Sequence, residues 1–153
     1  HFRRYNLVME KMMRTLNDLG EEATSFVGSL APSPLNATLV TLSGELGAGK
    51  TAFTKAVANA LGVTETVNSP TFVLEKIYLL PEDKPFKRLI HIDAYRLEKG
   101  SELGPLGFDE IMQDTDNLIL LEWPEKVADM LPAPSKKLSF VALPDGSRTI
   151  SYG

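Results

Sequence analysis

The sequence predicts an α/β fold, a three-layer sandwich whose mixed sheet is parallel at its centre and carries antiparallel hairpins at its edges. Three observations lead to this expectation. An apolar strand at 37–43 runs into a glycine-rich loop and then an amphipathic helix, as in parallel sheets flanked by helices. Turn-forming sequences at 81–85 and 144–147 each separate two β-rich segments. The length of 153 residues suits a single domain, which we expect to span residues 1–153.

Composition narrows the class of protein. With 43% hydrophobic and 24% charged residues, the chain is typical of a globular domain. The net charge of -4 disfavours unaided binding to a nucleic-acid backbone, which needs a clustered positive surface. The sequence contains no cysteine, so disulfides and cysteine nucleophiles are excluded. No apolar run approaches the roughly 18 residues of a membrane span and no signal peptide is visible, so we expect a cytoplasmic protein without a membrane partner.

The first part of the chain is expected to hold two helices and a strand. Apolar residues recur every three or four positions over roughly 10–30, which predicts an amphipathic helix that ends before Pro32. The apolar, β-branched run 37–43 predicts a buried strand. The helix after the glycine loop has one apolar face over 53–61 and should stop at Gly62.

The middle of the chain predicts a hairpin. Residues 71–80 read as one strand and 86–97 contain the returning strand, with turn residues between them. The glycine-rich stretch 98–117 follows and includes a short helical turn around 108–112.

The last part of the chain predicts one more central strand and a second hairpin. Residues 118–121 are fully apolar and end at Glu122, which is typical of a buried strand. The segments 137–143 and 147–152 flank an Asp-Gly turn signal, which favours an antiparallel hairpin.

The loop between the first predicted strand and its helix carries a phosphate-binding motif. Gly44, Gly49, Lys50 and Thr51 have the spacing G-x-x-x-x-G-K-T. Glycines let the backbone N–H groups converge on phosphate oxygens, and the following helix directs its positive end at them. In such a loop the lysine reaches the β- and γ-phosphates and the threonine hydroxyl ligates Mg²⁺. The fold expected is therefore P-loop NTPase-like.

Two carboxylates are placed to complete the site. Asp93 follows one apolar strand and Glu122 follows another. Ligands of open α/β sheets gather at the carboxyl ends of the strands, so either acid can hold Mg²⁺ or orient the attacking water. We expect Lys50, Asp93 and Glu122 to be the catalytic residues and Thr51, Glu122 and Asp93 to be the metal-binding ones. The division of labour between the two acids stays open.

Weaker candidates lie around these strands. Ser69 and Thr71 belong to a short polar loop whose hydroxyls could reach Mg²⁺ or the γ-phosphate, as switch segments do. His91 alternates with Asp93 along one strand face, and a lone strand histidine is more often structural than catalytic. With two histidines in the chain and no metal-ligand spacing, a zinc site is disfavoured.

The class of nucleotide reaction follows from missing motifs. Neither Asn-Lys-x-Asp nor Asp-x-x-Gly occurs, which favours ATP over GTP. The arginines beyond the loop are Arg88, Arg96 and Arg148, and we expect them not to be clustered, whereas a small-molecule kinase closes cationic groups over the transferring phosphoryl group. An ATPase with slow intrinsic hydrolysis and partner activation is therefore favoured. A small-molecule P-loop kinase and a nucleotide-dependent binding module remain the alternatives.

Four segments in order carry a resemblance to a known family. They are "SGELGAGKT", "NSPTF", "HIDAYRL" and "LLEWPE", and together they resemble the TsaE (YjeE) family over about residues 15–126. The loop "APSPLN" and a longer hairpin depart from the family pattern. The resemblance implies a Mg²⁺-dependent ATPase that drives or resets the TsaB–TsaD complex in threonylcarbamoyladenosine (t6A) modification of tRNA. Contact with tRNA would then be indirect.

The resemblance also implies roles for particular residues. Thr51 and Glu122 correspond to Mg²⁺ ligands, Asp93 to a Walker-B-like acid, and Ser69 to Phe72 to a switch-like loop. The adenine contact is expected near Met13 to Thr15. The residues expected to bind the nucleotide are Glu45, Leu46, Gly47, Ala48, Gly49, Lys50, Thr51, Ala52 and Trp123.

Overall fold

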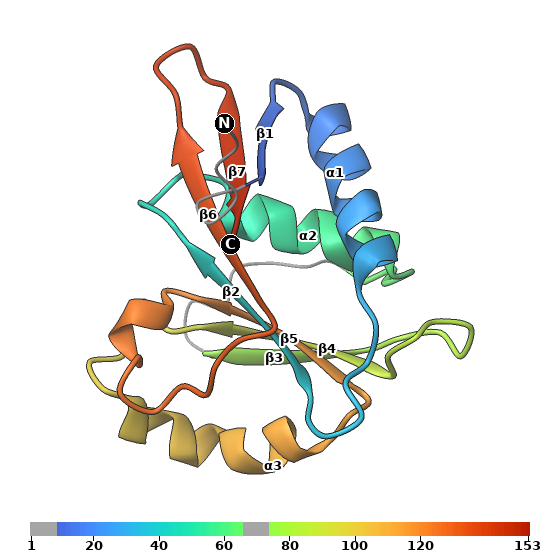
Figure 1. The fold of residues 1–153 in the computed structure, drawn as a ribbon, viewed down its shortest axis with the longest axis vertical. Helices are drawn as coiled ribbons and strands as arrows, with labels where there is room; N and C mark the ends of the chain where they lie inside the picture. Colours follow the sequence, from blue (N-terminus) through green and yellow to red (C-terminus); the bar gives the residue numbers. More distant parts are fainter. Residues whose placement is uncertain (1–8, 66–73) are drawn as a thin grey trace, which may run out of the picture.

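A computed structural model describes residues 9–65 and 74–153 of the chain. Within these ranges a seven-stranded sheet has the order β1-β7-β6-β2-β5-β4-β3 (Figure 1). The strands are β1 (Met9–Met13), β2 (Thr38–Ser43), β3 (Glu75–Leu79), β4 (Arg88–Asp93), β5 (Asn117–Glu122), β6 (Lys136–Ala142) and β7 (Arg148–Tyr152). The central strands β6, β2, β5 and β4 pair in parallel, and β1, β7 and β3 add antiparallel pairs outside them. The predicted mixed α/β sheet is confirmed.

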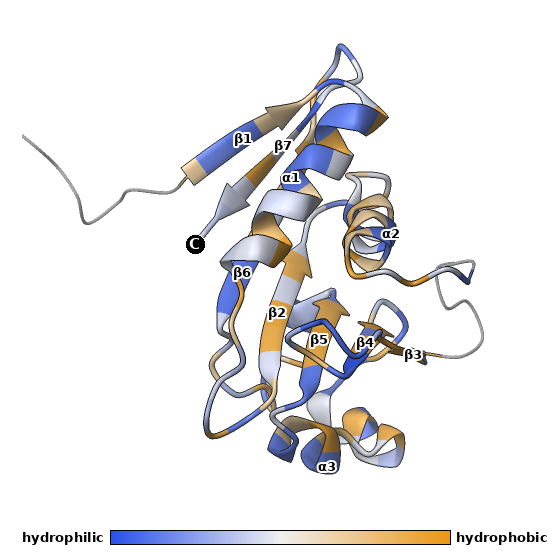
Figure 2. Cartoon of the chain, turned by 90° about the vertical axis from the view of Figure 1, so that its right-hand side faces the viewer, coloured by the Kyte–Doolittle hydropathy of each residue, from blue (hydrophilic) through white to orange (hydrophobic). Residues whose placement is uncertain are grey.

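Helices cover both faces of this sheet. Helices α1 (Leu16–Ser29) and α2 (Lys50–Ala60) lie on one face, and α3 (Phe108–Gln113) lies on the other (Figure 2). The 3₁₀ helix η1 (Gly100–Leu106) precedes α3, and a second one, η2 (Pro124–Lys126), follows β5. No helix in the described ranges is long and apolar enough to cross a membrane.

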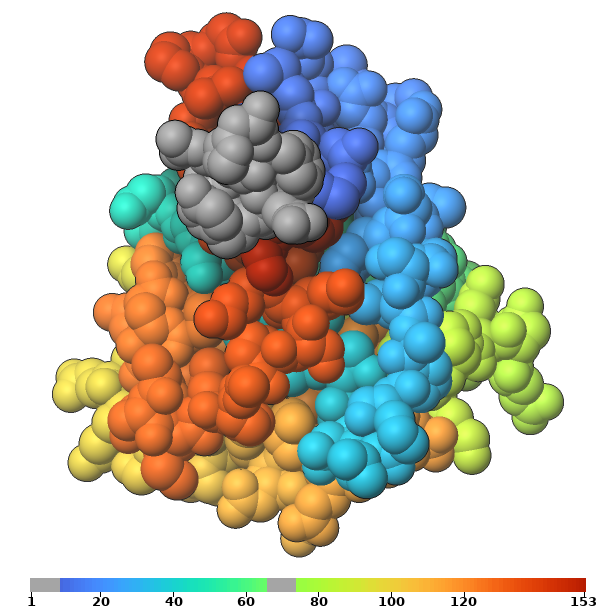
Figure 3. All heavy atoms as spheres, viewed as in Figure 1, coloured from blue at the N-terminus to red at the C-terminus, as the bar shows by residue number. Residues whose placement is uncertain are grey.

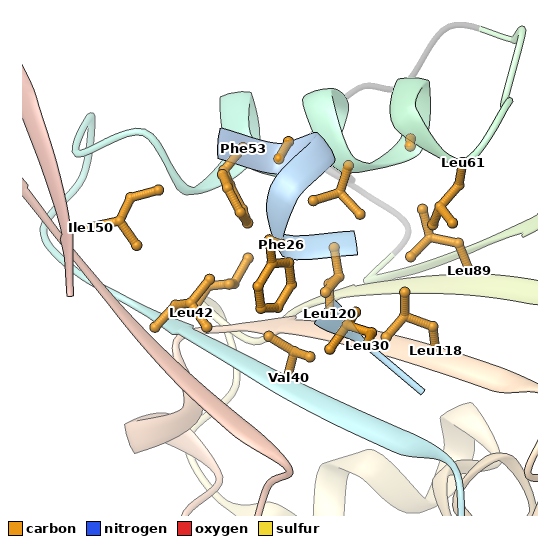
Figure 4. Packing of buried hydrophobic residues seen from close by; sticks show 14 of the residues in the cluster. Phe26, Leu30, Val40, Leu42, Phe53, Leu61, Leu89, Leu118, Leu120 and Ile150 are labelled. Carbon is orange, nitrogen blue, oxygen red and sulfur yellow. The ribbon is translucent and has the colours of Figure 1, made fainter. Parts of the chain in front are cut away.

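The larger core lies between the sheet and the pair α1 and α2 (Figure 4). Phe53 of α2 is its centre, because its ring lies 5.7 Å from that of Phe26 and 5.4 Å from that of Phe140, between ring centroids. Alternate residues of β2 and β5 point into this core and the remaining ones into a second core under α3. Burial on both faces explains why these central strands are almost continuously apolar.

Both predicted hairpins are confirmed. Strands β3 and β4 pair antiparallel, although the ordered strand starts at Glu75 and residues 71–73 of the predicted strand lie outside the described ranges. Strands β6 and β7 also pair antiparallel. Their turn is closed by the Asp145 carboxylate, which accepts hydrogen bonds from the Ser147 N–H and hydroxyl.

The helix predicted over 10–30 is wrong at its start. Residues Met9–Met13 form β1, an edge strand paired antiparallel with β7, and the helix begins only at Leu16. A capping box sets this boundary, since the Thr15 hydroxyl accepts from the Asp18 N–H at 3.0 Å and the Asp18 carboxylate accepts from the Thr15 N–H at 3.1 Å. Figure 3 shows the blue N-terminal elements against the red C-terminal hairpin at one end of the molecule.

The capping box yields a prediction about stability. Thr15→Ala should lower the free energy of unfolding by about 1 kcal/mol, because the first turn of α1 loses a hydrogen-bond acceptor. Asp18→Ala should also destabilise the fold, but in a pH-dependent way. Hydrogen bonds from the Arg14 and Thr15 N–H groups help to hold the pKa of Asp18 below its ordinary 3.8. Its contribution is therefore complete above that value and is lost as the pH falls through the lowered pKa.

Urea unfolding at several pH values measures both effects. The difference between the wild-type protein and Asp18→Ala should shrink in acid, whereas the Thr15→Ala difference should persist because a hydroxyl does not titrate there. An Asp18→Ala difference that is the same at pH 7 and at pH 2 would contradict the role given to the carboxylate.

Candidate functional site

The glycine loop between β2 and α2 is shaped by contacts that only glycine permits. Gly44 has φ 146° and Gly49 has φ 110°, a range that other residues rarely adopt. A Cβ on Gly44 would lie 2.5 Å from the backbone oxygen of Phe140, and one on Gly49 would lie 2.9 Å from Cδ of Arg148. The C-terminal hairpin therefore packs directly against the loop and fixes its position.

A cavity of about 460 Å³ opens beside the loop. Its lining contains most of the residues predicted to bind nucleotide, together with both predicted acids. The lining residues are Leu46, Gly47, Gly49, Lys50, Thr51, Ala52, Leu74, Asp93, Tyr95, Arg96, Glu122, Trp123 and Arg148. Two predicted residues do not line it, since the Ala48 side chain packs into the core and Glu45 contributes a backbone carbonyl to the loop. Ser69 and Thr71 lie outside the described residues.

Lys50 is the first residue of α2, and its side chain reaches back into the loop. Its Nζ donates to the backbone oxygens of Gly44 and Glu45 and sits 4.0 Å from the ring centroid of Trp123. Burial lowers the pKa of Lys50, and nearby carboxylates, Glu122 foremost, oppose that shift. The ammonium is thus held by weak neutral acceptors, and a phosphate in the cavity would be a stronger partner for it.

Thr51 and Glu122 meet across the cavity floor. The Thr51 hydroxyl lies 3.3 Å and 3.4 Å from the two carboxylate oxygens of Glu122. Thr51 belongs to the first turn of α2 and Glu122 ends β5, so 71 residues of chain separate them. A hydroxyl and a carboxylate are the hard oxygen donors that Mg²⁺ prefers, so the pair fits that ion.

Asp93 lies beside Glu122 at the same edge of the sheet. Strands β4 and β5 are parallel with Asp93 opposite Glu122, so both strands end together. The two acids differ in surroundings, because Glu122 is 2% exposed while Asp93 is half-buried. The Asp93 carboxylate accepts a hydrogen bond from the Tyr95 N–H at 3.0 Å.

In the described ranges no three His, Cys, Asp or Glu residues gather as a metal cage. Mg²⁺ usually needs only one or two carboxylates when phosphates complete its shell.

His91 approaches the same carboxylate from inside the protein. Its Nε2 is 2.6 Å from Oε2 of Glu122, and the imidazole is fully buried. The sequence pattern favoured a structural role, and the one signal for this contact was the alternation of His91 with Asp93 on one strand face.

Trp123 closes one side of the cavity. It is the one non-glycine residue in the described ranges with a positive φ, at 61°. Its backbone N–H donates to the Leu42 backbone oxygen at 3.1 Å, and the centroid of its ring lies 5.0 Å from that of the Tyr95 ring. The unusual backbone turns the chain immediately after Glu122 and places the indole on Lys50.

The arginines are more clustered in space than the sequence indicated. Arg96 and Arg148 both line the cavity, and Arg148 donates from Nη2 to the Gly47 backbone oxygen at 3.2 Å. Arg88 lies elsewhere, in an ion pair with Asp114. The expectation of unclustered arginines is therefore wrong for two of the three, because strand β7 brings Arg148 back to the loop.

A second cavity of about 170 Å³ adjoins the first. The two share Gly49, Ala52 and Arg148, and the second one is also lined by the segment Met13 to Leu16. The region expected to contact adenine thus lies next to the phosphate loop, on the α1 side.

Comparison with known proteins agrees with this architecture. Residues 12–150 match the family model of "Threonylcarbamoyl adenosine biosynthesis protein TsaE". The tRNA threonylcarbamoyladenosine biosynthesis protein TsaE of Bacillus subtilis is 37% identical over 91% of this chain and 82% of its own length. The protein of the same name from Rickettsia prowazekii is 34% identical over 91% of this chain and 92% of its own.

A solved structure extends the agreement to three dimensions. The crystal structure of Bacillus subtilis YdiB superposes with a TM-score of 0.74 at 27% identity, covering 95% of this chain and 84% of that one. The family resemblance carried by the four sequence segments is confirmed. Because the family model spans most of the chain and the relatives align along most of their own length, the chain belongs to the TsaE family.

Proposed function

We propose that the protein binds and hydrolyses ATP with Mg²⁺ and serves t6A modification of tRNA as an accessory to a TsaB–TsaD complex. One observation carries the catalytic part: the Thr51 hydroxyl and the Glu122 carboxylate meet on the floor of a cavity whose wall is the phosphate loop. The relatives are named for t6A biosynthesis, which supports the pathway.

Several residues of the cavity have roles that their positions support. The loop N–H groups and Lys50 would hold the phosphates, with Lys50 exchanging backbone carbonyls for phosphate oxygens. Thr51 and Glu122 would hold Mg²⁺, which when bound neutralises charge that develops on the phosphates. Asp93 would orient the attacking water, which is supported by its half-buried position beside Glu122.

The second cavity supports ATP as the nucleotide. It adjoins the phosphate loop through Gly49 and Ala52 and is lined by apolar side chains such as Met13 and Leu19. A cleft with mostly apolar walls suits a purine ring, and the absence of a guanine motif from the sequence favours adenine. Arg148 lies between the cavities and would contact the nucleotide between its base and its phosphates.

The arginines of the cavity support activation of ATP hydrolysis by a partner protein. Arg96 and Arg148 line the cavity, but Arg148 is engaged with the Gly47 carbonyl. Slow hydrolysis that a partner accelerates is common in P-loop proteins whose arginine is not yet on the phosphates. The acidic composition makes direct binding to tRNA unfavourable, so the protein would act on tRNA only through the partner complex.

A small-molecule kinase is the second candidate. The presence of Arg96 and Arg148 in one cavity favours it more than the sequence alone did, because arginines can clamp a transferring phosphoryl group. A screen of small phosphoryl acceptors separates the two candidates. Transfer to an acceptor at a rate far above hydrolysis would identify a kinase.

The first prediction from this site concerns Lys50. Lys50→Ala should reduce ATP hydrolysis by at least about a hundredfold, because the cation that accompanies the β- and γ-phosphates is removed. Steady-state phosphate release measures the rate and titration calorimetry measures Mg²⁺-ATP binding. Lys55→Ala is the matched control, since Lys55 is exposed on the same helix. Full activity in Lys50→Ala would refute the role of the loop.

The second prediction separates the two acids. Glu122→Gln should raise the Mg²⁺ concentration for half-maximal activity more than about tenfold, because a charged oxygen ligand is lost. Asp93→Asn should keep Mg²⁺-ATP binding while the turnover rate falls by about a hundredfold or more, as expected of a residue that orients water. Glu110→Gln serves as the control, because Glu110 is exposed on α3. Weakened Mg²⁺ binding in Asp93→Asn alone would exchange the two roles.

The third prediction concerns the partners. ATP hydrolysis by the purified chain should be slow and should rise when TsaB and TsaD are added together, because the complex completes the site. Phosphate release with and without the pair measures the effect, and Lys50→Ala should abolish the increase. An unchanged rate with the pair present would contradict the accessory role.

A further inference from the structure

We infer that His91 is a positioning residue: its imidazole donates a hydrogen bond to Glu122 and fixes the direction in which that carboxylate faces the cavity. The inference rests on the proposed function, in which Glu122 holds Mg²⁺ together with Thr51. It goes beyond it by assigning a role to a buried residue that does not line the cavity.

The sheet register creates this contact. In the parallel pair β4 and β5, His91 is opposite Leu120 and Asp93 is opposite Glu122. Side chains alternate along a strand, so His91, Asp93 and Glu122 all point to the face that carries α2. His91 is then the diagonal neighbour of Glu122, one step deeper in the sheet, at an Nε2–Oε2 distance of 2.6 Å.

Burial shields the hydrogen bond between His91 and Glu122 from water. The imidazole is 0% exposed and the Glu122 side chain is 3% exposed, so water does not compete for the bond. A carboxylate only accepts hydrogen bonds, so Nε2 must carry the hydrogen and donate it. Oε2 of Glu122 is thereby held from the interior, and the carboxylate presents its remaining lone pairs to Thr51 and the cavity.

The other imidazole nitrogen argues against a role in packing alone. Nδ1 of His91 is buried and bonds to no described residue. A buried polar atom without a partner costs free energy, which an apolar side chain of similar size would avoid. The hydrogen bond to Glu122 is a contact that an apolar side chain at this position cannot provide. Partners of this kind, which orient metal-binding carboxylates, usually govern metal affinity without touching the metal.

The test compares two replacements of His91. His91→Gln places an amide N–H close to the position of Nε2, whereas His91→Leu fills the space without a donor. In His91→Leu the Mg²⁺ concentration that half-saturates ATP binding should rise about 10- to 100-fold. His91→Gln should stay within about threefold of the wild-type protein. Titration calorimetry with ATP over a range of Mg²⁺ concentrations gives this value without requiring turnover.

Further measurements separate positioning from a general effect on the fold. ATP affinity in the presence of a chelator should be the same in both variants, because the phosphate loop is untouched. If His91→Leu does not fold, His91→Asn replaces it, because its shorter amide reaches only the position of Nδ1. His91→Asn should then show the weakened Mg²⁺ dependence that His91→Gln lacks.

The outcomes distinguish this inference from the proposed function. A Mg²⁺ dependence that is the same in the wild-type protein, His91→Gln and the donor-lacking variant would overturn the role of His91 and leave the ATPase proposal standing. A wild-type protein that binds no Mg²⁺-ATP would overturn the proposed function itself. Weakened Mg²⁺ binding in the donor-lacking variant with recovery in His91→Gln supports both.

Discussion

The parallel pairing of β2, β5 and β4 is the constraint on which the site depends. Leu42 and Asp93 both pair with Glu122, so the carboxyl ends of the three strands lie side by side at the same edge of the sheet. The phosphate loop leaves β2 there and the two acids end the neighbouring strands. The glycine loop and the two carboxylates thus lie at one edge of the sheet, although they are far apart in the sequence.

Burial gives this edge its chemical character. Lys50 and Glu122 are both nearly inaccessible to water, and each has protein partners that offset the loss of hydration. The partners differ in kind. Lys50 contacts neutral backbone carbonyls and an indole, which are weaker partners for an ammonium than a charged oxygen is. Glu122 contacts the imidazole of His91, which does not line the cavity. The two buried charged groups therefore differ, because Lys50 has neutral partners and Glu122 has an imidazole from the interior of the protein.

Sequence patterns correctly predicted the elements whose structure depends on residues close to each other in the chain. The apolar strands 37–43 and 118–121, the glycine loop and the Asp-Gly hairpin follow from residues within a few positions of each other, and the structure has all of them. Strand β1 was missed because its pairing partner, β7, lies at the other end of the chain. The spacing of apolar residues continued through Met12 in a helical pattern, but the Thr15–Asp18 capping box set the boundary. Arg148 was underrated for the same reason, since it reaches Gly47 only through the sheet.

The contact between His91 and Glu122 could not be predicted from the sequence, because it depends on the register between β4 and β5. Its residue type and its isolation in the sequence favoured a structural role, and neither property reports on a neighbouring strand. Two facts place it beside Glu122: the alternation of His91 with Asp93, visible in the sequence, and the register that sets Asp93 opposite Glu122. The first fact alone gives a face of the sheet, and the second converts that face into a contact. Because β4 and β5 are parallel, the residue two positions before Asp93 is the diagonal neighbour of the acid opposite Asp93, so the register decides that His91 meets Glu122.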